Sequence, residues 1–342
     1  MEIVAWAGIF IGVVLFLACG GSGDSLDRYC RKCGVSLAAV FVLLLPGLAA
    51  AAVLEGRLSN QTPDGGKVSK VEVALLFTRN GQEEKLTATT DANGKFRFAD
   101  LSPGEHYRVN LEYEGAEYGA AAEFDKTQDN LRIEISVYDS TSDPSSLRVK
   151  THQVVFNPGK NSLRVEETLQ VENAGQRAFI GSQPVDSQRR ATIELTLPEG
   201  AAGYQYGNGL MECCVVAAPK GFVDTMDVKP GVREIVFSYT LPASSEPYRF
   251  IRRLDYTTDA LNVLVGGGVS AKSPGLEARE AVQIQGVRYL QLAGKNLDGG
   301  TSMTVELADF PGRPVPFRYL VFAVLALILI AALVYVLVGR RK

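Results

Sequence analysis

The sequence predicts a mainly β protein with two extracytoplasmic β-sandwich domains, N-terminal apolar helices and a C-terminal transmembrane helix. Three observations carry this prediction. Short runs of alternating apolar and polar residues, bounded by turn residues, recur through residues 53–312. Helical periodicity is absent from that stretch. Long apolar runs flank it on both sides, as membrane segments would.

The composition excludes several classes of protein. An apolar fraction of 46% with 21% charged residues is that of a folded chain, so wholesale disorder is excluded. Only two His are present, which excludes a catalytic zinc site built on several imidazoles. Residues 53–316 hold 28 of the 35 basic and 35 of the 38 acidic residues, a net charge of −7. Phosphate contacts need surplus Lys and Arg, so we expect no nucleic-acid partner.

The C-terminal apolar run, residues 319–338, is 20 residues long and uncharged, and the basic tail 339–342 follows it. About 20 apolar residues cross a bilayer, so this run is a predicted transmembrane helix. Basic flanks stay on the cytoplasmic side, which places the tail in the cytoplasm. Residues 53–316 then lie outside the cell membrane, in a periplasmic or extracellular compartment.

Residues 1–52 hold two further apolar runs, 3–18 and 35–52. The second follows basic residues and ends in small ones, as a secretory signal peptide does, with cleavage after Ala52. Because a long stretch precedes it, two interpretations stay open: a true start downstream of Met1, or a membrane hairpin. Both place the body outside. Cys19 ends a lipobox-like run, and a lipoprotein is a further alternative.

The five cysteines fall into separate groups. Cys30 and Cys33 form one C-x-x-C knuckle, whereas structural zinc needs four ligands, so reduced thiols are favoured over a metal site. Cys213 and Cys214 are neighbours in the outside body, and on a strand their side chains would point apart. In a loop they could instead close a vicinal disulfide. A structural role is favoured, with redox activity or metal capture as the alternatives.

The first domain, residues 53–140, contains seven strand-like runs. Asn93-Gly94 supplies the positive φ of a tight turn between two of them. The runs are Val53–Ser59, Val71–Thr78, Lys85–Thr90, Lys95–Phe98, His106–Tyr113, Tyr118–Phe124 and Leu131–Val137.

Two stretches of this domain, Thr90–Phe98 and Leu101–Val109, together with Leu54-Glu55-Gly56-Arg57-Leu58, resemble a known family. The segment is similar to the carboxypeptidase regulatory-like domain, a seven-stranded sandwich of transthyretin type. The resemblance implies that fold and an adaptor, stalk or sugar-binding role. It implies no peptidase activity, because the zinc ligands of the catalytic domain that names the family have no counterpart here.

A polar breaker at residues 141–145 is the predicted linker, and residues 146–312 form a predicted second β-sandwich. Gly266–Gly268 is expected to be a loop between strands, since no helix start follows it as a phosphate site would require. The predicted strands are Leu147–Phe156, Leu163–Glu172, Thr192–Leu197, Arg233–Leu241, Asn262–Val265, Ala281–Val287 and Ser302–Leu307.

No catalytic or cofactor motif stands out, so we expect neither an enzyme nor a cofactor. His106 and His152 are each interpreted as half-exposed strand residues. Glu166 and Glu167 are neighbours on a predicted strand, so they should point to opposite faces and form no carboxylate dyad.

One cluster indicates binding. Tyr204, Tyr206 and Met211 lie in or beside a Gly-rich loop, residues 203–209, directly before the cysteine pair. The sequence therefore favours a non-catalytic, membrane-anchored binding or adaptor protein of the cell envelope, with another envelope or membrane protein as its partner. The alternatives are a carbohydrate-binding module with a glycan ligand, and a thiol redox protein using the two cysteines.

Overall fold

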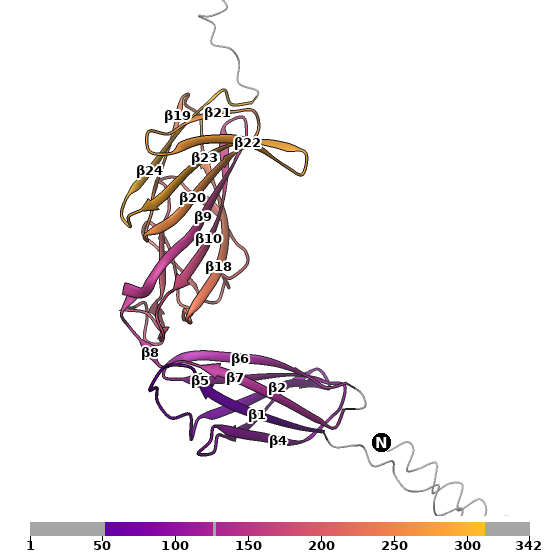
Figure 1. The fold of residues 1–342 in the computed structure, drawn as a ribbon. Helices are drawn as coiled ribbons and strands as arrows, with labels where there is room; N and C mark the ends of the chain where they lie inside the picture. Colours follow the sequence, from indigo (N-terminus) through magenta and orange to yellow (C-terminus); the bar gives the residue numbers. More distant parts are fainter. Residues whose placement is uncertain (1–51, 126–127, 312–342) are drawn as a thin grey trace, which may run out of the picture.

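The structure is a computed structural model that describes residues 52–125 and 128–311. Within these ranges the chain is mainly β, with strands β1 to β24 and one short 3₁₀ helix, η1 (Pro144–Ser146) (Figure 1). The predicted fold class is confirmed at that level: mainly β, with several packed sheets.

The first domain consists of two sheets. The smaller has the order β4-β1-β7, in which β1 runs antiparallel to β4 and parallel to β7; the larger has the order β3-β2-β5-β6. The strands are β1 (Ala52–Asn60), β2 (Glu72–Arg79), β3 (Gln82–Thr89), β4 (Lys95–Leu101), β5 (His106–Tyr113), β6 (Ala116–Glu123) and β7 (Asn130–Val137). Each of the seven predicted runs overlaps one of them.

Side chains that alternate between buried and exposed along the strands form the core of this domain. On β5 every second side chain from Tyr107 to Tyr113 is buried, and the residues between them are half-buried or exposed. Position 56 on β1 requires glycine, because a Cβ there would overlap the Phe96 ring on β4. The Leu-Glu-Gly-Arg-Leu stretch therefore carries a glycine for a packing reason.

The predicted turn at Asn93-Gly94 is confirmed. Gly94 has a φ of +75°, which the absence of a side chain permits. The Asp91 carboxylate accepts hydrogen bonds from the backbone N–H groups of Asn93 and Lys95, each at 2.8 Å. These bonds hold the connection between β3 and β4.

The second domain is built on a seven-stranded sheet of order β15-β18-β10-β9-β20-β23-β22. Its strands are β9 (Leu147–Pro158), β10 (Ser162–Asn173), β15 (Ala202–Tyr206), β18 (Gly231–Pro242), β20 (Thr258–Val265), β22 (Glu277–Ile284) and β23 (Val287–Leu297). Two three-stranded sheets accompany it: β14 (Ile193–Thr196), β17 (Gly221–Asp224) and β16 (Val215–Ala218), and β19 (Tyr248–Arg253), β24 (Ser302–Ala308) and β21 (Ser270–Lys272).

Both small sheets pack against the large one around a single hydrophobic core. Phe250 of β19 meets Phe156 of β9 with ring centroids 4.7 Å apart, and Phe222 of β17 meets Phe237 of β18 at 5.1 Å, both edge-on. Two layers of sheet around one core make this a sandwich-like domain.

The two domains are joined by backbone pairing. β8 (Ser140–Thr141) runs parallel to β11 (Ala178–Phe179), and Ala178 is buried in the core of the first domain. β12 (Gln183–Pro184) and β13 (Arg190–Ala191) form a small ribbon nearby in the chain. The predicted linker, residues 141–145, thus contains the end of β8 and the start of η1, whose cap is the Asp143 side chain.

Two predictions about local structure are wrong. Residues 203–209 were expected to be a loop, yet β15 covers Ala202–Tyr206 as an edge strand paired with β18. Ala281–Val287 was expected to be one strand, yet Gln285 and Gly286, with φ of +50° and +82°, form a tight turn between β22 and β23. The loop at Gly266–Gly268 is confirmed, since it connects β20 to β21.

In the described ranges, no helix is long and apolar enough to cross a membrane. The predicted membrane segments 3–18 and 319–338, the lipobox-like Cys19 and the Cys30–Cys33 knuckle lie outside the described residues. Of the predicted segment 35–52, only Ala52 is described. It is buried as the first residue of β1 and pairs with Leu101.

Candidate functional site

A cleft of about 1210 Å³ lies where the two domains meet. On the first-domain side it is lined by the loop before β2 and by residues of β2, β3, β5 and β6. β6 lies on the side of the first domain that is next to the second (Figure 1). Its walls include Lys67, Lys70, Glu117, Tyr118 and Gly119 from the first domain and Ile180, Arg189, Arg190, Met211, Cys214, Met226, Asp227 and Lys229 from the second. Ligand sites favour such junctions, so this cleft is the candidate site.

Tyr118 of β6 has contacts with both domains in the cleft. Its hydroxyl accepts a hydrogen bond from the Tyr138 backbone N–H at 2.9 Å and donates to the Tyr138 carbonyl at 3.2 Å. Lys229 Nζ lies 4.7 Å from the ring centroid and 2.8 Å from the Asp227 carboxylate. Burial, with the nearby Asp227 charge, raises the pKa of Tyr118 to about 12. The group therefore stays a neutral phenol.

The opposite wall carries Met211 and Cys214, which lie with Cys213 in a turn that precedes β16. The Met211 carbonyl accepts hydrogen bonds from the backbone N–H groups of Cys214 at 2.9 Å and Val215 at 3.1 Å. Arg189 donates to the Cys213 carbonyl at 3.2 Å. These bonds hold the turn while the Met211 side chain remains 48% exposed.

Both cysteines are free, and their Sγ atoms lie 3.0 Å apart. A strand would have pointed the side chains to opposite faces; Cys213 and Cys214 lie in the turn instead, which brings the sulfurs together. Burial, followed by the neighbouring Cys213, raises the pKa of the Cys214 thiol to about 11. Cys214 is therefore a protonated thiol at neutral pH, a weak nucleophile and a weak metal ligand.

We expect iodoacetamide to modify Cys214 slowly at pH 8 and faster as the pH approaches 11, because only the thiolate reacts. The measurement is a time course of alkylation of the wild-type chain, followed by mass spectrometry that locates the label on Cys213 or on Cys214. An unstructured cysteine peptide of the same sequence is the control. Reaction at pH 8 as fast as that control, or a native protein with the two sulfurs already joined, would contradict the prediction.

The structure separates the predicted contact residues. Met211 lines the cleft, whereas Tyr204 and Tyr206 belong to the edge strand β15 and are not part of its walls. Tyr206 packs edge-on against Phe222 with ring centroids 5.2 Å apart, and Tyr204 is 44% exposed with its hydroxyl donating to the Ala201 carbonyl. Tyr206 thus supports the fold, and Tyr204 and Met211 are the exposed members of the cluster.

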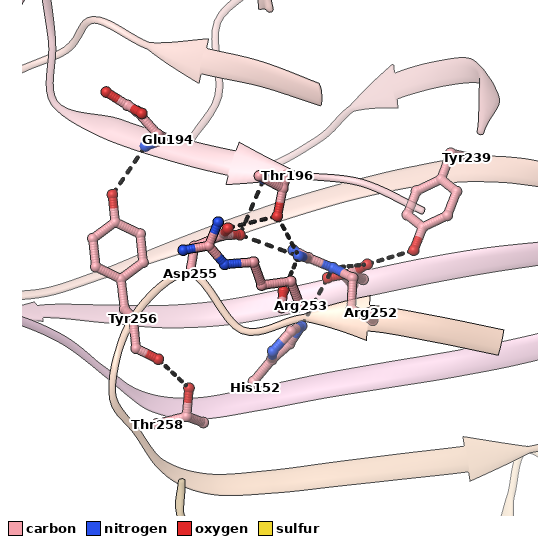
Figure 2. A network of polar contacts seen from close by, with 10 residues as sticks. His152, Glu194, Thr196, Tyr239, Arg252, Arg253, Asp255, Tyr256 and Thr258 are labelled. Carbon is pink, nitrogen blue, oxygen red and sulfur yellow. Dashed lines mark hydrogen bonds and ion pairs between the residues drawn. The ribbon is translucent and has the colours of Figure 1, made fainter. Parts of the chain in front are cut away.

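A second cluster of ionisable groups lies inside the second domain (Figure 2). The Glu167 carboxylate on β10 meets His152 Nε2 of β9 at 2.8 Å and accepts from the Tyr239 hydroxyl of β18 at 2.6 Å. Arg252 Nε of β19 donates to both carboxylate oxygens, at 3.1 and 3.2 Å. Arg252 Nη1 extends the network to Asp255 at 3.1 Å.

This network is sealed from solvent. The side chains of Glu167 and Arg252 are 0% exposed and that of His152 is 2% exposed. Burial alone would raise the pKa of Glu167, but the Arg252 guanidinium and the hydrogen bonds from His152 and Tyr239 outweigh it and lower the pKa to about 2. The strongly shifted carboxylate therefore serves the fold and is not accessible to a substrate.

The interpretation of His152 as half-exposed is wrong. β9 has an irregular register between the pairs Val171↔Val149 and Gln170↔Thr151, so that Lys150 is an extra residue. Such a bulge shifts the alternation by one, and His152 turns inward with Val154. One feature of the sequence could have indicated a buried charge here. Glu167 lies two residues after the apolar Val165 on β10, so the two side chains point to the same, buried face of the sheet.

Two other predictions can be compared with the described residues. Glu166 is exposed and Glu167 buried, as expected for neighbours on a strand. His106 lies on β5 as predicted, but its side chain is 83% exposed rather than half-exposed, with Nδ1 at 3.3 Å from the Glu123 carboxylate. In the part of the chain that the structure describes, no group of three or more His, Cys, Asp or Glu side chains is placed to hold a metal ion.

No family model matches the chain, and neither does any curated protein. Among solved structures it is similar to an M1 zinc metallopeptidase from Deinococcus radiodurans, at 13% identity and a TM-score of 0.30. A mutant of that enzyme bound to a Tyr-Ser-Ala substrate matches at 14% identity and the same TM-score. Each match covers 47% of this chain, which spans 42% of the matched one. Likeness this weak assigns neither a fold family nor an activity.

Proposed function

We propose that this protein is a membrane-anchored, extracytoplasmic binding or adaptor protein of the cell envelope, without catalytic activity of its own. The observation that carries the proposal is the cleft between the domains, with the exposed Met211 side chain on its wall. The uncharged run 319–338 and its basic tail support the membrane anchor and the outside location of the two domains.

Three basic residues of the second-domain wall have partners within that domain. Lys229 pairs with Asp227, Arg189 pairs with Asp186 at 2.7 Å, and Arg190 donates to the carbonyls of Gly181 and Ser182. These contacts fix part of the second-domain wall, and the exposed Met211 side chain on the same wall offers an apolar contact, which favours recognition of a partner over proton transfer.

The architecture of the first domain fits the proposal. Sheets of three and four strands, with a glycine packed under an aromatic ring, support a carboxypeptidase regulatory-like domain of transthyretin type. We infer that it acts as an adaptor module whose β5–β6 face forms one wall of the binding cleft.

The test is purification of the full chain from native membranes in mild detergent through a C-terminal tag, with mass spectrometry of retained proteins. We expect a stoichiometric partner with the wild type and about tenfold less of it with Met211→Asp. The substitution replaces an apolar contact with a carboxylate that would lose its hydration when the partner binds. Met211 is half-exposed, so the melting temperature should not change. Ile251→Asp, 50% exposed on β19 and outside the cleft, is the matched control. Equal recovery with both variants, or a protein that purifies alone, would reject the proposal.

A thiol redox role is the second candidate, because the sulfurs of Cys213 and Cys214 lie 3.0 Å apart and Cys214 lines the cleft. Loss of function in the double serine variant would favour it over the adaptor role. The glycan-binding alternative has less support: Tyr204 is the one aromatic among the exposed large apolar side chains of residues 52–125 and 128–311.

A further inference from the structure

The hairpin formed by β22 and β23 carries exposed apolar side chains at its tip. Ile284, Val287 and Leu290 are 45%, 46% and 38% exposed. They are three of the eight large apolar side chains that are exposed in the described parts of the chain. Single exposed apolar residues are ordinary on a protein surface, whereas a group of them in one short hairpin marks a contact site.

The tip of this hairpin extends beyond the end of the large sheet (Figure 1). β20 ends at Val265, which pairs with Leu290 of β23. From Leu290 to Gly286 the hairpin continues for four residues, about 13 Å at about 3.3 Å per residue, without β20 beside it. The apolar side chains of Ile284 and Val287 thus lie past the body of the domain.

The described chain ends at the same end of the domain. Ala308, the last residue of β24, pairs with Ser270, which follows β20 by a short turn. The Phe310 ring then packs edge-on against Tyr248 at 6.3 Å, and Pro311 is the last described residue. The first domain joins at the opposite end, where β9 begins.

Seven residues, 312–318, separate Pro311 from the apolar run 319–338. Seven residues span at most about 25 Å. A bilayer that holds this run therefore lies within about 25 Å of the end of the domain from which the hairpin projects.

We propose that the tip of the β22–β23 hairpin contacts the lipid bilayer that anchors the chain. Ile284 and Val287 enter the boundary between headgroups and acyl chains, and Arg288 lies at the phosphate level. Arg288 is the single charged residue from Ala281 to Leu290, so the tip carries no acidic group that an anionic surface would repel. This inference rests on the proposed membrane anchor.

A second copy of the chain is the competing occupant, since β22 is an edge strand of the large sheet. The distribution of charge favours the bilayer. Glu277, Arg279 and Glu280 are exposed along the part of β22 that lies within the sheet, and charges there protect an edge from pairing with another strand. The apolar residues are confined to the tip.

Tryptophan fluorescence tests the contact, because Trp6 is the single tryptophan of the chain. In a Trp6→Phe background, Val287→Trp is placed in the full chain and reconstituted into liposomes of phosphatidylcholine and phosphatidylglycerol, with or without brominated acyl chains. Val232→Trp is the matched control: Val232 is 54% exposed and pairs with Glu172 at the opposite end of the sheet. Ile284→Trp provides a second reporter across the turn.

We expect the tip reporters to emit at shorter wavelength in liposomes and to be quenched by brominated lipid at least about twofold more than the Val232→Trp control. Equal quenching in a protein that floats with the liposomes would overturn the hairpin contact and leave the anchor standing. A protein that does not float would overturn the anchor as well. A blue shift that depends on protein concentration and is insensitive to bromine would assign the tip to a second copy and overturn the lipid contact.

Discussion

Replacing Arg252 by methionine is expected to lower the free energy of unfolding of the second domain by about 3–5 kcal/mol. The substitution keeps much of the side-chain volume but removes the guanidinium that faces both oxygens of Glu167. Glu167 is 0% exposed and keeps only His152 and Tyr239 as partners. A buried carboxylate without its counter-charge is the cause of the large loss.

Denaturant unfolding of the full chain in detergent, followed by circular dichroism, measures this effect. Arg253→Met is the matched control, because Arg253 follows Arg252 on β19 but is exposed. A change within about 0.5 kcal/mol is expected for it. Similar losses in the two variants would show that the buried ion pair does not carry the stability that its geometry indicates.

Adding Glu167→Gln to Arg252→Met is expected to recover part of the loss, because a neutral amide is less costly to bury than an unpaired carboxylate. The dependence of stability on pH gives a second measure of the Glu167–Arg252 ion pair. The pKa of Glu167 is lowered from 4.5 to about 2 in the fold, so its contribution, on the order of 3 kcal/mol, is present above about pH 4.5 and is lost as the pH falls toward 2. This acid loss should be smaller in the variant that lacks Arg252.

The extent to which the sequence predicts this fold differs between the two domains. Each of the seven strands β1 to β7 overlaps a predicted run, and the turn at Asn93-Gly94 follows from the requirement for positive φ. In the second domain β16 (Val-Val-Ala-Ala) and β17 (Gly-Phe-Val-Asp) were not predicted, because neither short segment alternates apolar and polar residues. The bulge at Lys150 reverses the inward side of β9, and a bulge leaves no clear mark in a single sequence.

The buried network could not be predicted, because its members are distant in the chain. Glu167 is 15 residues from His152, 72 from Tyr239 and 85 from Arg252. The candidate cleft was predicted in part, since Met211 and Cys214 drew attention through their residue types. Its other wall belongs to β5 and β6, and only the docking of the two domains brings that wall opposite Met211.

Replacing Asp139 by alanine is expected to destabilise the first domain by about 2–4 kcal/mol and to loosen its attachment to the second. Asp139 is 6% exposed, and its carboxylate accepts hydrogen bonds from Asn60 Nδ2 at 2.7 Å and the Gly66 N–H at 3.0 Å. Arg177 of the second domain lies 3.5 Å from the other oxygen. Burial tends to raise the pKa of Asp139, but these donors outweigh it and keep the pKa below its usual range, so the charged form is the bound one.

The loss of this carboxylate leaves the Gly66 N–H of the first domain without its acceptor and removes the ion-pair partner of Arg177 in the second, so the docking that forms the cleft should weaken together with the first domain. We expect calorimetry of Asp139→Ala to show two separated transitions where the wild type shows one, and partner capture to fall as it does for Met211→Asp. Asp129→Ala, an exposed carboxylate of the same domain, should leave both readouts unchanged. A single transition with unchanged capture in Asp139→Ala would mean that β8–β11 pairing holds the domains by itself and that the cleft does not depend on the Asp139 contacts.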